Sequence, residues 1–110
     1  MPWVKLDDSF HSHPKPRKAW GISKASIGLH AFALAYAGHY ETDGAIPAWF
    51  LESVIPDEAE RQSALDALLT SGLWVRVGEG YEVHDFLDFN PSHKSLEEKR
   101  KRDRERKGDK

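Results

Sequence analysis

The 110-residue chain contains no cysteine and only one methionine. Without cysteine it can form no disulfide, no thiolate nucleophile and no cysteine-based zinc site, and this composition suits a reducing compartment. Long hydrophobic runs are missing too, because the longest apolar stretch, residues 27–37, is interrupted by His30 and is too short to cross a membrane. The N-terminus has no hydrophobic signal segment. We therefore expect one cytoplasmic domain without membrane contact.

A large net charge of one sign is also absent, but the charges are unevenly distributed. The formal net charge is −2. Residues 1–40 carry five basic and two acidic residues, a balance of +3. Residues 41–93 carry two basic and eleven acidic residues, a balance of −9, and residues 94–110 carry nine and five, a balance of +4. This asymmetry indicates nucleic-acid binding through the basic ends, and it predicts that the middle of the chain repels phosphate.

The N-terminal segment predicts mostly irregular structure. Residues 3–6 are a short apolar segment typical of an edge strand, and Asp7 or Asp8 can cap a helical turn after it. Residues 13–19 contain two prolines, which lack an N–H and restrict the preceding residue. This pattern predicts an extended or turn-like basic connection.

A long helix is predicted over residues 25–40, with Ser23 or Ser26 as its cap. The helix is apolar nearly all round, which is typical of a central helix packed on several sides. Residues 42–44, Thr-Asp-Gly, then predict a turn, and residues 45–46 predict a very short strand.

Two further helices are predicted in the acidic middle of the chain. Pro47 suits the first turn of a helix over residues 47–54, because its missing N–H costs nothing there. The side chains expected to point inward are Trp49, Phe50, Leu51 and Val54. Asp57 is a good cap for a second helix over residues 57–71, and Gly72 suits a left-handed C-terminal cap.

The remainder of the chain predicts a hairpin and a charged helix. Apolar alternation predicts a β-hairpin over residues 73–84 with its turn at residues 78–80. Residues 85–90 fit a packed turn that covers one end of the core. From Ser92 onward the chain predicts a capped, highly charged helix whose only large apolar residue is Leu96, which excludes a coiled coil.

This order of elements is the topology of a winged helix-turn-helix domain, so the expected fold class is mainly α with a small antiparallel β-hairpin (α+β). Helices 47–54 and 57–71 would be the paired helices, and hairpin 73–84 would be the wing. We assign residues 1–91 to the winged-helix domain with an N-terminal extension. Residues 92–110 form a basic, charged C-terminal helix or tail.

Five short segments also carry a family resemblance: Trp3-Val4-Lys5-Leu6-Asp7-Asp8-Ser9-Phe10, His13-Pro14-Lys15, Thr42-Asp43-Gly44, Leu73-Trp74-Val75 and Tyr81-Glu82-Val83-His84-Asp85-Phe86. They resemble the N-terminal winged-helix domains of phage replication-initiation (replisome-organiser) proteins, and small helix-turn-helix proteins of actinobacterial phages are similar. The resemblance spans about residues 3–95. It implies a winged-helix fold and a DNA-linked role in phage biology, in the host bacterial cytoplasm.

The predicted DNA contacts fall into two groups. Basic side chains of the N-terminal connection, the hairpin and the tail would neutralise phosphates: Lys15, Arg17, Lys18, Arg76, Lys99, Arg100, Lys101, Arg102, Arg104 and Arg106. Near the start of helix 57–71 the candidate base-reading residues are Arg61, Gln62 and Ser63, because Arg pairs with guanine and Gln with adenine. The same turn carries three carboxylates, which compete with phosphate for the helix N-terminus.

The charged tail fits three arrangements. It can contact DNA, or it can be a solvated helix with internal pairs at i,i+4 spacing, such as Glu97 with Lys101. It can also contact the acidic hairpin or helix of another copy of the chain.

No set of residues predicts an enzyme, a cofactor or a metal site. His11 and His13 match no zinc motif and fit capping and packing. His84 beside Asp85 is accompanied by no nucleophile motif and no phosphate-binding glycine loop. The tryptophans are expected to pack in the core or at its edge, whereas an exposed Trp3 or Trp20 would suit stacking on bases.

We therefore expect a non-enzymatic phage-type winged-helix protein that binds double-stranded DNA in replication initiation or transcriptional regulation. The alternative is a winged-helix protein-interaction module. Its acidic surface, residues 41–93, would bind a host or phage protein or form a homodimer.

Overall fold

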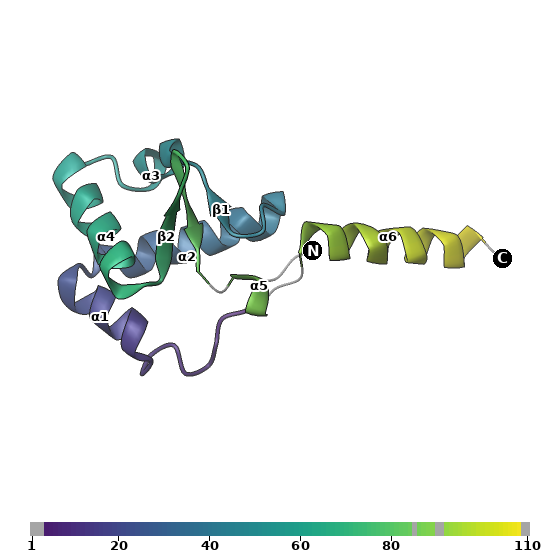
Figure 1. The fold of residues 1–110 in the computed structure, drawn as a ribbon, viewed down its shortest axis with the longest axis horizontal. Helices are drawn as coiled ribbons and strands as arrows, with labels where there is room; N and C mark the ends of the chain where they lie inside the picture. Colours follow the sequence, from purple (N-terminus) through teal and green to yellow (C-terminus); the bar gives the residue numbers. More distant parts are fainter. Residues whose placement is uncertain (1–3, 85, 90–91, 109–110) are drawn as a thin grey trace.

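The computed structural model describes residues 4–84, 86–89 and 92–108. This part of the chain contains six helices and three short strands. In chain order they are α1 Pro14–Ile22, α2 Ala25–Tyr40, β1 Ala45–Ile46, α3 Ala48–Val54, α4 Glu58–Ser71, β2 Trp74–Val77, β3 Gly80–Val83, α5 Phe86–Phe89 and α6 His93–Gly108. Figure 1 shows α1 to α4 gathered around a small sheet, with α6 extending away from them. The chain is mainly helical with a small antiparallel sheet, which confirms the α+β class. No described helix is both long and apolar enough to cross a membrane.

Helix α1 lies where the two prolines predicted an extended connection over residues 13–19, so that prediction is wrong. Pro14 and Pro16 both fall in the first turn of the helix, where backbone N–H groups have no helical partner and proline costs little. His13 supplies the cap, because its Nδ1 accepts a hydrogen bond from the Lys15 N–H at 3.2 Å. The basic residues of this segment are therefore displayed on a helix.

The strand predicted for residues 3–6 is also wrong for residues 4–6, which join no sheet, while Trp3 lies outside the described residues. The Val4 side chain instead lies over Gly38 of α2, where no Cβ obstructs it. The turn predicted at Asp7 is confirmed, since its Oδ1 accepts hydrogen bonds from Ser9 N at 2.9 Å and Ser9 Oγ at 2.8 Å.

Helix α2 has the predicted bounds and is buried on several sides by α1, α3, α4 and β1. The predicted serine cap is wrong. Lys24 occupies the N-cap position, and its side chain makes no capping hydrogen bond. Ser26 Oγ instead donates to the Ser23 carbonyl at 2.6 Å. The helix ends at Glu41, whose left-handed φ of 55° turns the chain toward β1.

Helices α3 and α4 match their predicted ranges to within one residue. The cap predicted at Asp57 is confirmed, because its Oδ2 accepts from Glu60 N at 2.9 Å. Gly72, with φ 85°, ends α4 in the left-handed conformation that glycine adopts without strain. The inward orientation predicted for Trp49 is wrong, since its side chain is 63% exposed and Leu51 is the buried residue of this short helix.

The predicted hairpin forms from β2 and β3, which pair from Trp74 opposite Val83 to Val77 opposite Gly80. Its turn has two residues rather than the three predicted. Strand β1 pairs antiparallel with β3, so the sheet order is β1-β3-β2. A Cβ at Gly80 would lie 2.9 Å from the Ile46 carbonyl oxygen, so glycine permits the close approach of β1.

The hydrophobic core lies where α2, α4 and the sheet meet, and its largest fully buried hydrophobic side chains are Trp74, Leu29, Ile46 and Leu68. Burial of Trp74 requires a partner for its indole N–H. Trp74 Nε1 donates to His30 Nδ1 at 2.9 Å, across 44 residues of sequence. The buried His30 is thus part of the core.

The segment after the hairpin closes one end of the core through Phe86, which is buried at the start of α5. This agrees with the packed turn predicted there, although Asp85 and Asn90 lie outside the described residues. Ser92 then caps α6 as predicted, because its Oγ accepts from Ser95 N at 3.0 Å.

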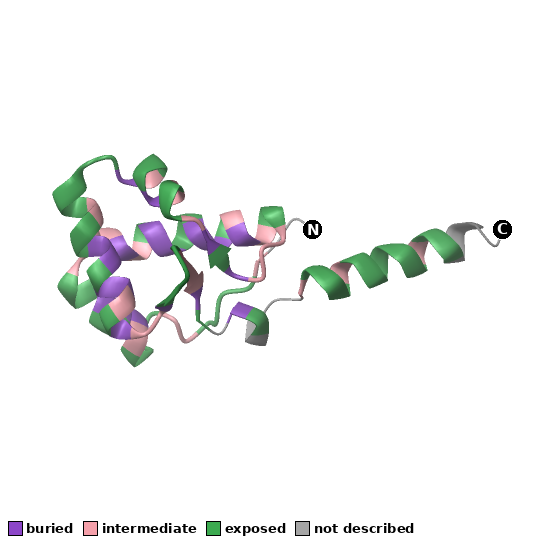
Figure 2. Cartoon of the chain, turned by 45° about the horizontal axis from the view of Figure 1, so that its top comes forward, coloured by how far each residue is buried: buried purple, intermediate pink, exposed green. Residues whose placement is uncertain are grey.

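Helix α6 protrudes from the rest of the molecule. Figure 2 shows buried residues throughout the body and none among the described side chains of α6. The radius of gyration is 16.0 Å, against about 13 Å for a compact chain of this length. The helix therefore presents its charges to solvent on nearly all sides.

Candidate nucleic-acid interface

The three predicted base-reading residues lie in the first turns of α4. Gln62 and Ser63 are exposed. The Arg61 side chain is partly buried, and its Nη1 donates to the carbonyls of Ile55 at 3.1 Å and Pro56 at 3.0 Å. Arg61 therefore fastens the turn between α3 and α4, while Gln62 and Ser63 are open to solvent.

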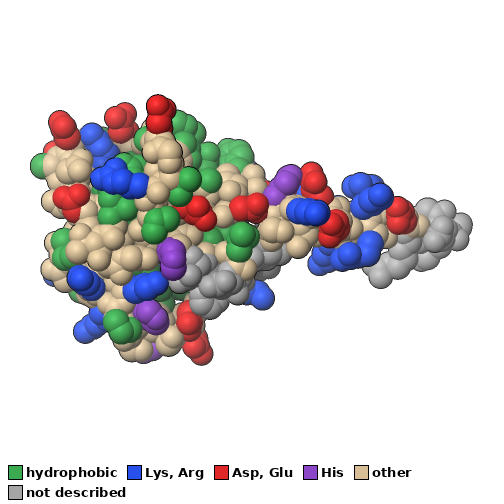
Figure 3. Space-filling model, viewed as in Figure 1, with side chains coloured by type: hydrophobic (Ala, Val, Ile, Leu, Met, Phe, Trp, Pro, Cys, Tyr) green, Lys and Arg blue, Asp and Glu red, His purple; other side chains and the backbone are tan. Residues whose placement is uncertain are grey.

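Carboxylates dominate the start of α4. Asp57, Glu58 and Glu60 are exposed there, and Glu52 is exposed on α3 just before them. Figure 3 shows Asp and Glu side chains projecting from the upper edge of the body, where α3 and α4 lie, and Lys and Arg side chains over α1 at the lower left. Phosphate near the α4 N-terminus would meet like charge. Cations that hold a phosphate backbone must come from other elements.

The hairpin offers one cation. The guanidinium of Arg76 lies 5.6 Å from the centre of the Tyr81 ring, and its Nη1 donates to Tyr81 Oη at 3.5 Å. Glu79 is exposed in the turn beside it. The hairpin tip is therefore close to neutral.

Helix α1 carries three of the basic residues of the body and packs directly against α4. Arg17 and Lys18 are exposed, and Lys15 is half-buried with its Nζ 3.5 Å from His84 Nδ1. Because α1 and α4 are neighbours, these cations stand beside the paired helices. Lys24 was not among the predicted contacts, although residues 9–40 contain four basic and no acidic side chains.

The base of α6 is fixed to the turn after α2. His93 N donates to Asp43 Oδ1 at 2.7 Å, and His93 Nδ1 lies 2.8 Å from Glu41 Oε2. Arg100 forms an ion pair with the other Glu41 oxygen. Arg100, predicted as a phosphate contact, is thus engaged within the molecule.

The other predicted tail contacts lie along the protruding helix. The exposed ones are Lys99, Lys101, Arg102 and Arg104, while the Arg106 side chain lies outside the described ones, and Lys94 is a further exposed cation of the helix that was not predicted. The predicted pair of Glu97 with Lys101 does not form, because Glu97 Oε1 lies 3.0 Å from His93 Nε2 instead. Most α6 cations are therefore displayed to solvent.

The contacts at the base of α6 shift two pKa values in opposite directions. Hydrogen bonds, first from Arg100 and then from His93, hold the pKa of Glu41 below its ordinary value. The hydrogen bond to Glu41, and then the charge of Glu97, raise the pKa of His93 above 6.5. The Glu41 contribution is lost as the pH falls through its lowered pKa, and the His93 contribution is lost as the pH rises through its raised pKa. Attachment of α6 is strongest between these two values.

Replacing Glu41 by Gln should lower the pKa of His93 toward its ordinary value, because the carboxylate that favours the imidazolium is gone. The measurement is an NMR titration of the His93 imidazole. Glu98→Gln, which neutralises a different carboxylate and lies on α6, is the matched control and should leave the pKa of His93 unchanged. If the pKa of His93 is the same in both variants, Glu41 does not hold His93 at the base of α6.

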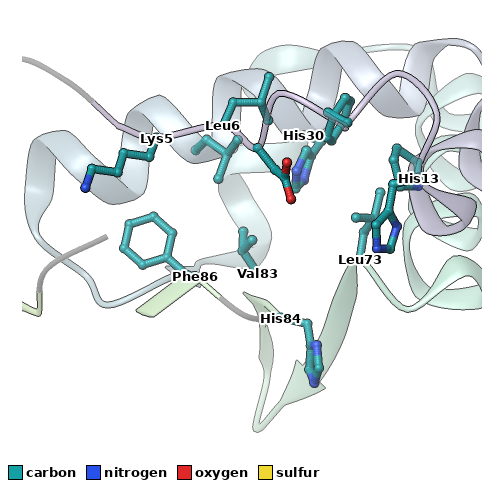
Figure 4. A pocket seen from close by; sticks show the side chains of 12 residues that line it. Lys5, Leu6, His13, His30, Leu73, Val83, His84 and Phe86 are labelled. Carbon is teal, nitrogen blue, oxygen red and sulfur yellow. The ribbon is translucent and has the colours of Figure 1, made fainter. Parts of the chain in front are cut away.

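A cavity of about 120 Å³ opens between the N-terminal segment, α2 and the hairpin. Figure 4 shows side chains from these three parts around it, among them His13, His30 and His84. His30 is only 5% exposed and stacks parallel to Phe10, with ring centroids 5.7 Å apart. Burial lowers the pKa of His30 to about 4, so the ring is neutral at physiological pH. Since Nδ1 accepts from the indole N–H, the His30 proton lies on Nε2.

The three histidines at this cavity do not make a metal centre. No group of three His, Asp or Glu side chains converges on one point within the described part of the chain. His13 caps α1, His30 holds the core indole and His84 lies beside Lys15. Each imidazole therefore has a structural contact of its own.

Comparison with known protein families, with curated proteins and with solved structures found no match for this chain. The functional assignment therefore rests on the geometry of the helices, the hairpin and the charged surfaces described above. Two features dominate that geometry: an acidic region around α3 and the start of α4, and basic surfaces on α1 and α6.

Proposed function

We propose that the chain is a phage-type winged-helix DNA-binding protein that acts in replication initiation or transcriptional regulation. The observation that carries the proposal is the arrangement of α3, α4 and the β2–β3 hairpin. A pair of helices joined by a short turn is followed directly by an antiparallel hairpin, and β1 completes the sheet in the order β1-β3-β2. In winged-helix proteins the second paired helix enters the major groove and the hairpin approaches the backbone. Those roles fall here to α4 and β2–β3.

Phosphate contacts in this proposal come from the basic residues of α1 and α6. Helix α1, which carries the exposed Arg17 and Lys18, packs against α4, whereas α6 extends away from the body and would supply a second basic surface. Gln62 and Ser63, which are exposed near the start of α4, would contact base edges in this proposal. Because few residues read bases and many neutralise phosphate, we expect affinity that depends strongly on salt.

A titration of labelled duplex DNA followed by fluorescence anisotropy tests the proposal. Affinity should fall by about a hundredfold or more between about 50 and 200 mM salt, since several phosphates would be neutralised. Reversing charge with Glu58→Lys and Glu79→Lys should raise the affinity, because both carboxylates would face phosphate. No binding to any duplex at the lower salt concentration would refute the proposal.

A second candidate function, a protein-interaction module, is favoured by an aromatic face on α2 and α3. Tyr36 lies 4.9 Å from Tyr40, 6.0 Å from Trp49 and 4.6 Å from Phe50 between ring centroids. Tyr40 is 64% exposed, and Glu52 lies one turn after Trp49 on α3. Exposed aromatic clusters are typical of protein interfaces. The acidic rim suits a basic partner or a second copy of the chain.

The two functions respond differently to the same variants. If α3 and α4 are a protein interface, Glu58→Lys should weaken partner binding instead of strengthening DNA binding. Capture of a stoichiometric host protein that is independent of DNA, and is abolished by Trp49→Ala, would favour the second function.

A further inference from the structure

An open groove of about 230 Å³ lies where the segment before α1, helix α1 itself and the start of α2 meet. It is lined by Phe10, His11, Pro16, Arg17, Trp20 and Ile27. Its walls are thus largely aromatic and apolar, with one guanidinium among them. A cavity of about 150 Å³ holds one benzene ring, so this groove has room for a single planar ring.

Trp20 is the exposed aromatic side chain of this groove, at 46% exposure. The sequence predicted that the tryptophans pack in the core or at its edge. It also predicted that an exposed Trp20 would suit stacking on bases. The Lys24 ammonium lies 5.7 Å from the centre of the Trp20 indole. Arg17 precedes Trp20 by one helical turn and lines the same groove. One cation therefore lies over the ring, and a second lines the same groove.

No carboxylate is among the described residues that line the groove, and Arg17 is the charged residue in its lining. Residues 9–40, which include all of α1 and α2, contain no Asp or Glu, and the nearest carboxylates in sequence are Asp7 and Asp8. Asp7 is engaged with the backbone and hydroxyl of Ser9. An anion that approaches α1 therefore meets cations without competing carboxylates on the helix.

We propose that this groove binds single-stranded nucleic acid, with an unpaired base stacked on Trp20 and the adjoining phosphates held by Arg17 and Lys24. Aromatic rings interleaved with cations are what single-strand binding requires, because every base has a π-face and every nucleotide a phosphate. Paired bases inside a duplex have their faces covered by the neighbouring base pairs, so they must be unstacked before an indole can contact them. This site shares Arg17 with the proposed duplex-binding surface, but its stacking residue, Trp20, has no part in that surface.

Trp49 shows why exposure alone does not make such a site. It is more exposed than Trp20, but it lies among other aromatic rings on a face with Glu52 nearby. A phosphate beside Trp49 would meet a carboxylate, whereas a phosphate beside Trp20 would meet Arg17 or Lys24. Trp49 is therefore the matched control for Trp20.

The test is anisotropy with labelled oligothymidylate of about twelve nucleotides, within the usual site size for single strands. Trp20→Ala should weaken binding about tenfold or more, Trp20→Phe should retain most of it, and Trp49→Ala should leave it unchanged. Arg17→Gln, which leaves the indole in place, should reduce the slope of log affinity against log salt by about 0.7. Circular dichroism of each variant verifies the fold.

Equal single-strand affinity of the wild type and Trp20→Ala, or an equal loss in Trp20→Ala and Trp49→Ala, would overturn the proposal. The same titration with labelled oligouridylate shows whether the groove prefers RNA or DNA. Binding of either strand that depends on Trp20 supports the site. Duplex DNA is titrated with the same proteins. If the wild-type protein binds single strands but not duplex DNA, the proposed function is refuted and this inference stands. If it binds duplex DNA but not single strands, this inference is refuted and the proposed function stands.

Discussion

The free energy of unfolding should fall by about 3 kcal/mol as the pH is lowered from 6.5 through about 4, because His30 is buried as a neutral imidazole. The unfolded chain takes up a proton at this residue near pH 6.5, and the folded chain does so only near pH 4. Between these values the unfolded state binds more protons, so acid favours unfolding. Above pH 6.5 this contribution is fully present and no longer changes with pH.

The contacts of His30 explain why its protonation is costly. The ring lies between Phe10 and the Trp74 indole, and its Nδ1 accepts the indole N–H. A proton placed on Nδ1 would remove that acceptor and leave two donors facing each other. Burial opposes the charged form in addition. Protonation therefore disrupts the buried hydrogen bond on which the core tryptophan depends.

Denaturant unfolding measured at a series of pH values checks this prediction. His30→Gln keeps an oxygen that can accept from Trp74 and cannot titrate, so the acid-dependent loss of stability should largely disappear. His39→Gln removes an exposed histidine of the same helix and should reproduce the wild-type profile. Parallel pH profiles for the wild type and His30→Gln would show that His30 does not control acid stability.

Neutralising four exposed cations of α6 should lower duplex affinity by about a hundredfold or more near 0.1 M salt, because these side chains would hold phosphates in the proposed complex. The residues to replace by Gln are Lys99, Lys101, Arg102 and Arg104. Arg100 is left in place because its ion pair with Glu41 attaches the helix. Each lost phosphate contact should reduce the slope of log affinity against log salt by about 0.9.

The fourfold variant keeps the helix, since Gln has nearly the helix propensity of Lys and Arg. Circular dichroism confirms this, and Glu98→Gln on the same helix serves as a charge control that should slightly raise affinity. An unchanged salt slope in the fourfold variant would show that α6 is solvated and that α1 supplies the phosphate contacts.

The local signals of the sequence predicted several elements closely. Helix α4 begins after Asp57 and ends before Gly72 as expected, because a carboxylate cap and a left-handed glycine act within a few residues of themselves. The β2–β3 hairpin follows from alternation and a glycine-containing turn. Helix α1 was missed because two prolines indicated a break, whereas both fit the first turn of a helix.

The candidate site was predicted only in part. The cations of α1 and α6 were identified from composition, but Arg61 and Arg100 turned out to be engaged with backbone carbonyls and with Glu41. Base stacking at Trp20 was predicted only on the condition that its side chain is exposed. The sequence could not decide this, because the exposure of a tryptophan depends on what packs against it.

The sequence by itself determined the partition of charge into two basic ends and an acidic middle, and the elements that caps, turns and alternation define over short distances. The tertiary structure alone decided the bond between Trp74 and His30, across 44 residues, and the attachment of Arg100 to Glu41, across 59. Local patterns carry no information about which distant residue will face a given side chain. That pairing is set by how the helices and the sheet pack, and it decides which charges and rings remain open to a partner.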